Sequence, residues 1–133
     1  MTTRVVCDAS VVIAALLDSG PDGHWATGQL SGCELFAPDL LPYEGANVLR
    51  RLESSKAISH DQAALAYADL LELHVELWPY EPLAARVWAL RHNLTSYDAA
   101  YVALAETLSS PLLTLDRRIA RSPGPECVIT TRT

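Results

Sequence analysis

Two carboxylates directly follow short apolar stretches of the sequence. Asp8 comes after residues 4–7, and Asp116 comes after residues 111–115. Short stretches rich in apolar and β-branched residues are typical of buried strands. The carboxyl ends of parallel strands meet at one edge of a sheet, where the functional crevice of an open α/β sheet lies. We therefore expect these two side chains to lie at the same edge.

Two further acids stand at the predicted starts of helices. Glu44 follows a Pro-Asp-Leu-Leu-Pro turn, and Asp98 stands three residues after Thr95. Each acid also has a purely structural explanation. Asp8 and Asp116 suit N-caps, Glu44 suits the first turn of a helix, and Thr95 with Asp98 suits a capping box. That explanation is weaker for the four acids together, because two of them leave apolar strands at the same edge.

Carboxylates that converge on one point repel one another unless a cation is present. A donor set made only of oxygens suits Mg²⁺ or Mn²⁺. A zinc site is not predicted, because no HExxH or similar pairing occurs among the histidines, which are His24, His60, His74 and His92. A divalent ion held by carboxylates beside water is suited to phosphodiester hydrolysis, since it lowers the pKa of the water and stabilises the leaving oxygen.

The charge balance limits how the chain can meet a polyanion. Ten Lys and Arg residues stand against 16 Asp and Glu residues, which gives a formal net charge of −6. A protein that grips nucleic acid through a broad basic coat is therefore excluded. Any phosphate contact must be local, and the candidates are Arg50, Arg51, Lys56, Arg117, Arg118 and Arg121. Solvated helix faces explain each of these residues equally well.

The sequence must position these acids with a small number of elements. Half of the 133 residues are apolar and a fifth are charged, which favours one globular domain over residues 1–133. We expect strands at 4–7, 34–37, 75–78, 111–115 and 127–130, with helices at 9–17, 24–30, 43–52, 59–73, 82–90, 95–108 and 117–120. Strands that alternate with helices predict an α/β sandwich whose central parallel sheet has about five strands.

Three local details refine this expectation. Gly20-Pro-Asp-Gly23 is expected to break the chain before residue 24. Ser59 and Gln62 predict a capping box, and the helix that follows is expected to bury Leu65, Ala68 and residues 71–73. The helix over 95–108 is rich in alanine, which lets it lie close against a sheet.

The cysteines and the apolar runs indicate in which cellular compartment the protein is expected. Cys7, Cys33 and Cys127 form neither an even set nor a CxxC motif, so we expect no disulfide framework and a reducing cytoplasm. The longest uncharged runs are too short to cross a bilayer. Asp8 interrupts any apolar region of a signal peptide.

At this point the chain resembles PIN-domain ribonucleases, and within them the VapC toxins of bacterial toxin–antitoxin modules. The resemblance covers the chain from end to end in the family's order. It rests on four segments: Val-Val-Cys-Asp8-Ala-Ser10, Leu-Pro-Tyr-Glu44-Gly-Ala-Asn, Leu-Thr-Ser-Tyr-Asp98-Ala-Ala-Tyr and Leu-Leu-Thr114-Leu-Asp116-Arg-Arg.

The resemblance implies a Rossmann-like, PIN-like α/β/α fold and a Mg²⁺ or Mn²⁺ site that cleaves single-stranded or looped RNA. It makes Asp8 and Asp98 the main metal ligands, with Glu44 and Asp116 completing the acidic cluster. Ser10 and Thr114 take the place of hydroxyls that support a carboxylate or a bound water. Many members have two acids in the last motif, whereas here Leu115 precedes the single Asp116.

The resemblance also implies partners. The family's toxins form homodimers, and a small VapB-type antitoxin lays its tail across the active site and binds promoter DNA with its other end. Two alternatives stay open on the sequence alone. One is a catalytically idle PIN-fold binding module, and the other is a PIN-like nuclease that acts on other nucleic acids.

Overall fold

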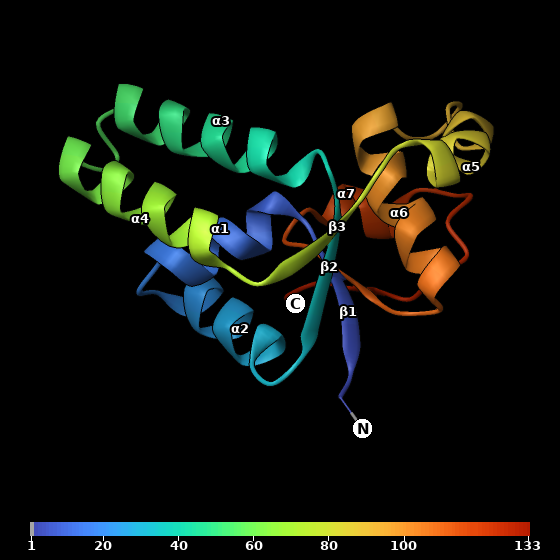
Figure 1. The fold of residues 1–133 in the computed structure, drawn as a ribbon, viewed down its shortest axis with the longest axis horizontal. Helices are drawn as coiled ribbons and strands as arrows, with labels where there is room; N and C mark the ends of the chain where they lie inside the picture. The colour runs from blue at the N-terminus through green and yellow to red at the C-terminus, as the bar shows by residue number, and fades with distance from the viewer. Residues whose placement is uncertain (1) are drawn as a thin grey trace.

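A five-stranded, fully parallel sheet forms the centre of the computed structural model, which describes residues 2–133. Its strand order is β3-β2-β1-β4-β5 (Figure 1). The strands are β1 (Arg4–Cys7), β2 (Glu34–Pro38), β3 (Val75–Trp78), β4 (Leu112–Leu113) and β5 (Ile129–Thr130). All four neighbouring pairs run parallel. The predicted parallel sheet of about five strands is confirmed.

β1 occupies the centre of the sheet because its residues are apolar on both faces. Val6 and Cys7 are fully buried, and Val6 pairs with Phe36 of β2 and with Leu112 of β4. Strands of parallel sheets that are covered on both sides have continuous apolar sequences of this kind. Asp8 therefore leaves the sheet at its most enclosed position.

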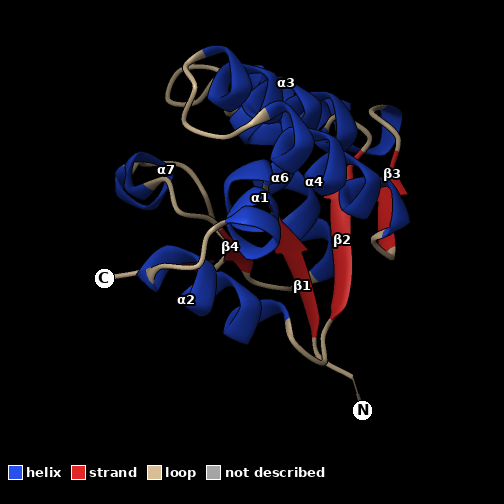
Figure 2. Cartoon of the chain, turned by 90° about the vertical axis from the view of Figure 1, so that its left-hand side faces the viewer, coloured by secondary structure: helices blue, strands red, loops and turns tan. Residues whose placement is uncertain are grey.

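Helices cover both faces of the sheet. In Figure 1, helices α1 to α4 lie on one side of the strands, and α5 and α6 lie on the other. Figure 2 views the chain from the side of α1 to α4. The helices are α1 (Ala9–Leu17), α2 (Pro21–Leu30), α3 (Leu41–Ser54), α4 (His60–Glu72), the 3-10 helix η1 (Glu81–Leu83), α5 (Ala84–Ala89), α6 (Ser96–Leu108) and α7 (Arg117–Arg121). This arrangement is the predicted α/β/α sandwich.

α6 is the helix that packs most closely on the sheet. It contacts β1, β2 and β4, and every residue from Ala99 to Ala105 is buried. Small alanine side chains allow this close approach, as the sequence predicted. The helix therefore holds its N-terminal turn, which carries Asp98, in a fixed place beside the carboxyl ends of the strands.

α2 begins earlier than expected. Gly20-Pro-Asp-Gly23 was expected to break the chain, but Gly20 is the N-cap of α2 and Pro21 is its first residue. Proline suits that position because its φ is already helical and the missing N–H has no partner in the first turn. The glycines and the proline therefore start the helix.

The predicted buried face of α4 is wrong, apart from Leu73, which follows the helix and is partly buried against the core. The capping box of Ser59 and Gln62 is present, but Leu65 and Leu71 are 65% and 61% exposed, and Ala68 is also exposed. The residues that pack inward are Ala63, Ala66 and Leu70. This stripe of mostly small residues, three and four positions apart, lets α4 lie against α1 and α3.

The last two strands are shorter than predicted, with two residues each. Backbone pairing nevertheless continues past their ends, because the Thr114 N–H donates a hydrogen bond of 3.1 Å to the Thr130 carbonyl. The stretch that leads to Asp116 is thus still tied to the sheet. None of the helices described for residues 2–133 has the length and apolar character needed to cross a membrane.

The start of α2 yields a test of the fold. A Cβ atom at Gly23 would lie 1.7 Å from the backbone oxygen of Asp18, whereas one at Gly28 would meet nothing within 4 Å. Gly23→Ala must therefore displace backbone and is expected to destabilise the fold by about 2 kcal/mol or more. Gly28→Ala, the control in the same helix, is expected to stabilise it by about 0.5 kcal/mol. Urea unfolding of both variants measures this, and equal stabilities would contradict it.

Candidate active site

Asp8 is the most enclosed acid of the site. It directly follows β1, caps the N-terminus of α1, and is only 8% exposed. Its Oδ1 accepts hydrogen bonds from the Ser10 hydroxyl (2.6 Å) and from the Val11 N–H (3.2 Å). Its Oδ2 accepts a short hydrogen bond from the Thr114 hydroxyl. Both carboxylate oxygens therefore face donors that fix their position.

The two hydroxyls that hold Asp8 are themselves held by the backbone after β4. The Leu115 N–H donates to Ser10 Oγ (3.0 Å), and the Asp116 N–H donates to Thr114 Oγ1 (2.9 Å). Each hydroxyl has one proton. Because the backbone supplies protons to both oxygens, each hydroxyl proton is directed to Asp8. This network joins the ends of β1 and β4 and ties Ser10 and Thr114 to the Asp8 carboxylate, while their roles in a functional site stay a prediction.

Glu44 enters the site from α3. It is half-buried near the start of that helix, and its Oε1 accepts a hydrogen bond of 2.7 Å from the Tyr101 hydroxyl. Tyr101 belongs to α6 and is 2% exposed. Burial, and then the nearby Glu44 carboxylate, raise the pKa of Tyr101, so the hydroxyl keeps its proton and acts as the donor.

Asp98 and Asp116 lie at the starts of two other helices. The Thr95 hydroxyl accepts a hydrogen bond from the Asp98 N–H, so Thr95 caps α6 as expected. Asp116 caps α7 and accepts a hydrogen bond from the Arg118 N–H. The Arg118 guanidinium also donates two hydrogen bonds, of 3.1 and 2.8 Å, to this carboxylate. Asp98 is half-buried, and Asp116 forms an ion pair with Arg118.

The electrostatics show that the acids share one region. Burial raises the pKa of Asp8. Its hydrogen-bond donors lower this pKa in part, and the charge of Asp98 raises it further. Burial also raises the pKa of Glu44, where Tyr101 acts in the opposite direction and the charges of Asp8 and Asp98 add to the rise. The pKa of Asp98 is raised by burial and by the charge of Asp116.

Asp116 differs from the other three acids. The hydrogen bonds and charge of Arg118 hold its pKa below the usual range, although burial acts against them. Arg118 is thus the one candidate arginine that contacts the predicted acids. Asp8, Glu44 and Asp98 therefore have raised pKa values, whereas Asp116 already forms an ion pair with Arg118.

The structure brings the four acids to one edge but does not close them into a metal cage. Within residues 2–133, no three His, Cys, Asp or Glu side chains are grouped closely enough to hold an ion. Glu44 is turned to Tyr101 and Asp116 to Arg118. The donor set nevertheless fits a hard divalent cation, because all four side chains offer oxygens and no nearby cation lowers the pKa of Asp8 or Glu44.

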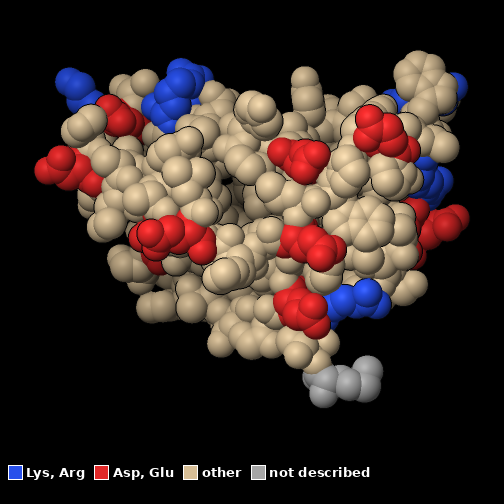
Figure 3. All heavy atoms as spheres, in the orientation of Figure 1, with Lys and Arg blue, Asp and Glu red and all other residues tan. Residues whose placement is uncertain are grey.

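The other predicted arginines lie outside this cluster. Arg50 is exposed on α3, where its Nε donates to the side chain of Asn47 (2.9 Å), and Arg117 is exposed and donates to the Arg132 carbonyl (3.1 Å). On the face shown in Figure 3, acidic side chains are spread widely and basic ones are few. Phosphate contact by Arg50 and Arg117 stays a prediction.

Tyr101 is the residue of the site that sequence reasoning missed. It lies 57 positions from Glu44, so no local pattern links the two. Its position, one helical turn after Asp98 in a stretch of small apolar residues, was a usable signal. A tyrosine predicted to be buried must find a partner for its hydroxyl, and the acids at the same edge are the available acceptors.

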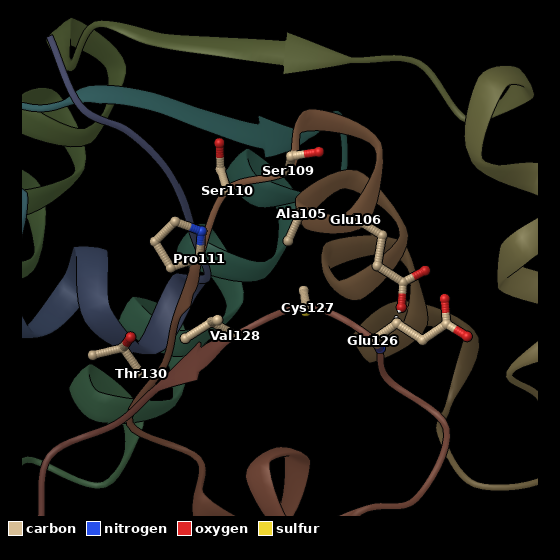
Figure 4. Close-up of a pocket in the computed structure, with 9 residues that line it drawn as sticks. All are labelled: Ala105, Glu106, Ser109, Ser110, Pro111, Glu126, Cys127, Val128 and Thr130. Atoms are coloured by element: carbon tan, nitrogen blue, oxygen red, sulfur yellow. Dashed lines mark hydrogen bonds between the residues drawn. The ribbon is translucent and has the colours of Figure 1, made fainter. Parts of the chain in front are cut away.

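A large cavity of the described structure lies away from these acids. Its volume is about 570 Å³, and it lies between the end of α6 and the region of β5 (Figure 4). The carboxylate of Glu106 points into this region. It accepts hydrogen bonds of 2.7 and 3.1 Å from the Arg86 guanidinium and a further one from the Glu126 N–H. Pro111, at the amino end of β4, also lines it. It is thus at the opposite edge of the sheet from Asp8.

Glu44 offers a test of the electrostatics in metal-free protein. Its folded-state pKa is raised, so folding is weakened as pH rises from about 4.5 through that higher value. Glu44→Gln keeps an oxygen that accepts the Tyr101 hydrogen bond and removes the charge. At neutral pH in EDTA we expect it to be more stable than the original protein, by at most about 1 kcal/mol because the group is half exposed.

Thermal or urea unfolding across pH measures the difference, which is expected to disappear in acid, where the carboxyl is protonated in both states. Glu72→Gln, at an exposed position at the end of α4, is the control and is expected to show no such trend. A Glu44→Gln protein that is less stable at neutral pH would contradict the assigned repulsion.

Comparison with known proteins gives the family. A family model described as PIN domain matches residues 5–124. Ribonuclease VapC1 of Mycobacterium tuberculosis is 43% identical over 125 residues, which are 93% of this chain and 94% of that protein. Ribonuclease VapC9 of the same species is 36% identical over 126 residues, with 95% and 96% covered.

A solved structure agrees in fold. The structure of VapBC2 from Rickettsia felis, bound to a DNA fragment from their promoter, has a TM-score of 0.68 at 13% identity and covers 98% of this chain and 100% of its own. The sequence relatives and this fold lead to one assignment: the chain belongs to the PIN-domain family, within its VapC group.

Proposed function

We propose that this protein is a metal-dependent endoribonuclease toxin of the VapC type. The observation that carries the proposal is the convergence of Asp8, Glu44, Asp98 and Asp116, from four separate elements, on the carboxyl edge of the sheet. Similar chains that match nearly the whole sequence are named ribonucleases. RNA is accordingly the proposed substrate, and hydrolysis of its phosphodiester bonds is the proposed reaction.

We further propose that Asp8 and Asp98 are the main ligands of a Mg²⁺ or Mn²⁺ ion, with Glu44 and Asp116 completing the site. Support comes from the raised pKa values of Asp8, Glu44 and Asp98, because a nearby cation removes the repulsion and the desolvation cost that raise them. When bound, the ion lowers the pKa of the attacking water and offsets charge on the phosphate.

The chain's own residues provide the positioning. Ser10, Thr114 and the Val11 N–H hold Asp8 from three directions, so its oxygens need not reorganise when the substrate arrives. Glu44, held by the Tyr101 hydroxyl, keeps one carboxylate oxygen free of that bond. We assign this oxygen the role of accepting a hydrogen bond from the attacking water and so orienting it.

Arg118 is the proposed phosphate contact at the site. Its guanidinium is exposed and lies against Asp116 with bidentate geometry. The same planar fork matches a phosphate group. An RNA backbone placed over the acids can therefore draw Arg118 from Asp116, while Arg50 and Arg117 contact phosphates farther along the strand.

The partners follow from the same assignment. The similar structure from Rickettsia felis is described as a VapBC complex on promoter DNA. We propose that this chain likewise binds a VapB-type antitoxin and acts in the cytoplasm. A homodimer within a larger toxin–antitoxin complex is part of this proposal.

The nuclease assignment predicts loss of cleavage when one acid is neutralised. Asp8→Asn and Asp98→Asn keep side-chain size but remove a charged ligand. Each is expected to cleave total cellular RNA at least about 100-fold more slowly, because the bound ion contributes several kcal/mol to the transition state. Discrete fragments should form with the original protein in Mg²⁺ or Mn²⁺ and be absent in EDTA.

Asp69→Asn is the matched control, since Asp69 is exposed on α4. It is expected to cleave at the original rate. All preparations must be freed of antitoxin and checked for folding by circular dichroism. Intact RNA with every preparation of the original protein, or equal cleavage by the Asp8→Asn protein, would refute the nuclease assignment.

Metal binding has a readout that does not depend on catalysis. Millimolar Mg²⁺ is expected to raise the thermal unfolding midpoint of the original protein, because a ligand that binds only the folded state stabilises it by RT ln(1 + [L]/Kd), about 2.7 kcal/mol at a hundredfold excess over Kd. The Asp98→Asn protein should gain much less, and the Asp69→Asn protein should gain as much as the original. Equal midpoint shifts in all three proteins would contradict the assigned ligands.

A further inference from the structure

A small apolar cavity lies at the same edge of the sheet as the acids. Its volume is about 190 Å³, and it is formed where β2 and β3 end. Trp78 is the last residue of β3, and Tyr80 follows it closely. Tyr97, in the first turn of α6, supplies a third aromatic side chain to the lining. Three aromatic residues from two segments thus line one small space.

The cavity is linked to the acid site by the helices that carry two of the acids. Tyr97 directly precedes Asp98 in α6. Leu40, which also lines the cavity, is the N-cap residue of α3, and this helix carries Glu44 in its first turn. The elements that position two of the acids therefore also build two walls of the cavity.

The lining is suited to a flat aromatic ring. Leu83 and Ala100 close the cavity on the protein side and are 1% and 6% exposed, whereas Tyr80 and Tyr97 are 57% and 62% exposed. The Trp78 indole N–H is occupied by Glu76 Oε2 at 3.0 Å. Trp78 is thus left with an aromatic surface rather than a free donor. These features favour stacking over hydrogen-bonded recognition.

We propose that this cavity binds an unstacked nucleobase of the RNA, next to the phosphate that is hydrolysed at the acid site. The inference rests on the proposed ribonuclease function. A base that has left its stack gains most from aromatic surfaces. Base stacking does not require positive charge on the protein. It therefore suits this chain, which has a net charge of −6 and brings one of the predicted arginines, Arg118, to the acid site. The cavity anchors the substrate by its base.

The first test compares RNA cleavage by Tyr80→Ala and Tyr97→Ala with that by the original protein. Both tyrosines are well exposed, so their loss leaves the core intact. We expect KM for a single-stranded RNA oligonucleotide to rise about tenfold, the scale of one lost stacking surface, with a smaller change in kcat. Tyr80→Phe and Tyr97→Phe retain the ring and should recover most of the loss. Tyr67→Ala, exposed on α4, is the control and should be unchanged.

The second test measures binding without cleavage. A single-stranded RNA that contains 2-aminopurine is titrated with the Asp8→Asn protein, since fluorescence of this base falls when it stacks. We expect quenching that is lost when Tyr80→Ala or Tyr97→Ala is added to this background. An oligonucleotide with an abasic residue at the same place should bind about tenfold more weakly.

The outcomes separate this inference from the function on which it rests. Cleavage by the original protein with unchanged KM in both alanine variants overturns the base pocket and leaves the nuclease intact. Absence of cleavage refutes the nuclease, and the fluorescence titration then decides the pocket: quenching supports base binding, and no quenching refutes it. Alanine variants that lose co-purified antitoxin while their RNA kinetics are unchanged would assign the cavity to a protein partner instead.

Discussion

The burial of the Asp8 carboxylate is the constraint on which the site depends. A carboxylate that is 8% exposed must be met by donors or by a cation. The donors come from the end of β4 and from the first turn of α1, through Thr114, Ser10 and the Val11 N–H. The pairing of β1 with β4 is therefore more than a matter of sheet stability. It brings Thr114, 106 positions away in sequence, to the second oxygen of Asp8.

Two of the remaining acids, Glu44 and Asp98, depend on helices that are fixed by packing. α6 lies on β1 and β2 because its inward residues are small, and its first turn then places Asp98 beside Asp8. The Tyr101 hydroxyl of the same helix reaches Glu44 of α3, so the two helices are tied across the carboxyl edge. One rigid element thus supports two acids and also a wall of the aromatic cavity. Loose packing of α6 would disturb all three together.

The strands, most helices and the position of the four acids at one edge of the sheet could be predicted, because each leaves a local signal. Asp8 follows a continuous apolar run, and Ser59 with Gln62 forms a capping box that the structure contains. The contacts that tune the site were not predictable, since they join distant segments: Tyr101 with Glu44 is one example. The face of α4 was misjudged for a related reason. Leucine content indicated Leu65 and Leu71, but the close approach of neighbouring helices selected the alanine stripe instead.

The acidity of the chain limits how it can hold the proposed RNA substrate. Like charges at Asp8, Glu44 and Asp98 oppose both folding and the approach of a phosphate, and the Arg118 charge is already engaged by Asp116. Affinity must then come from interactions that do not depend on a basic surface. In the proposed function, a bound metal ion would remove the repulsion at the scissile phosphate, and the proposed base stacking at Trp78 and Tyr97 would provide attraction beside it. With the metal ion at the phosphate and stacking at the base, recognition of the proposed RNA substrate would depend on an unpaired base, because a base inside a duplex has no free face for stacking.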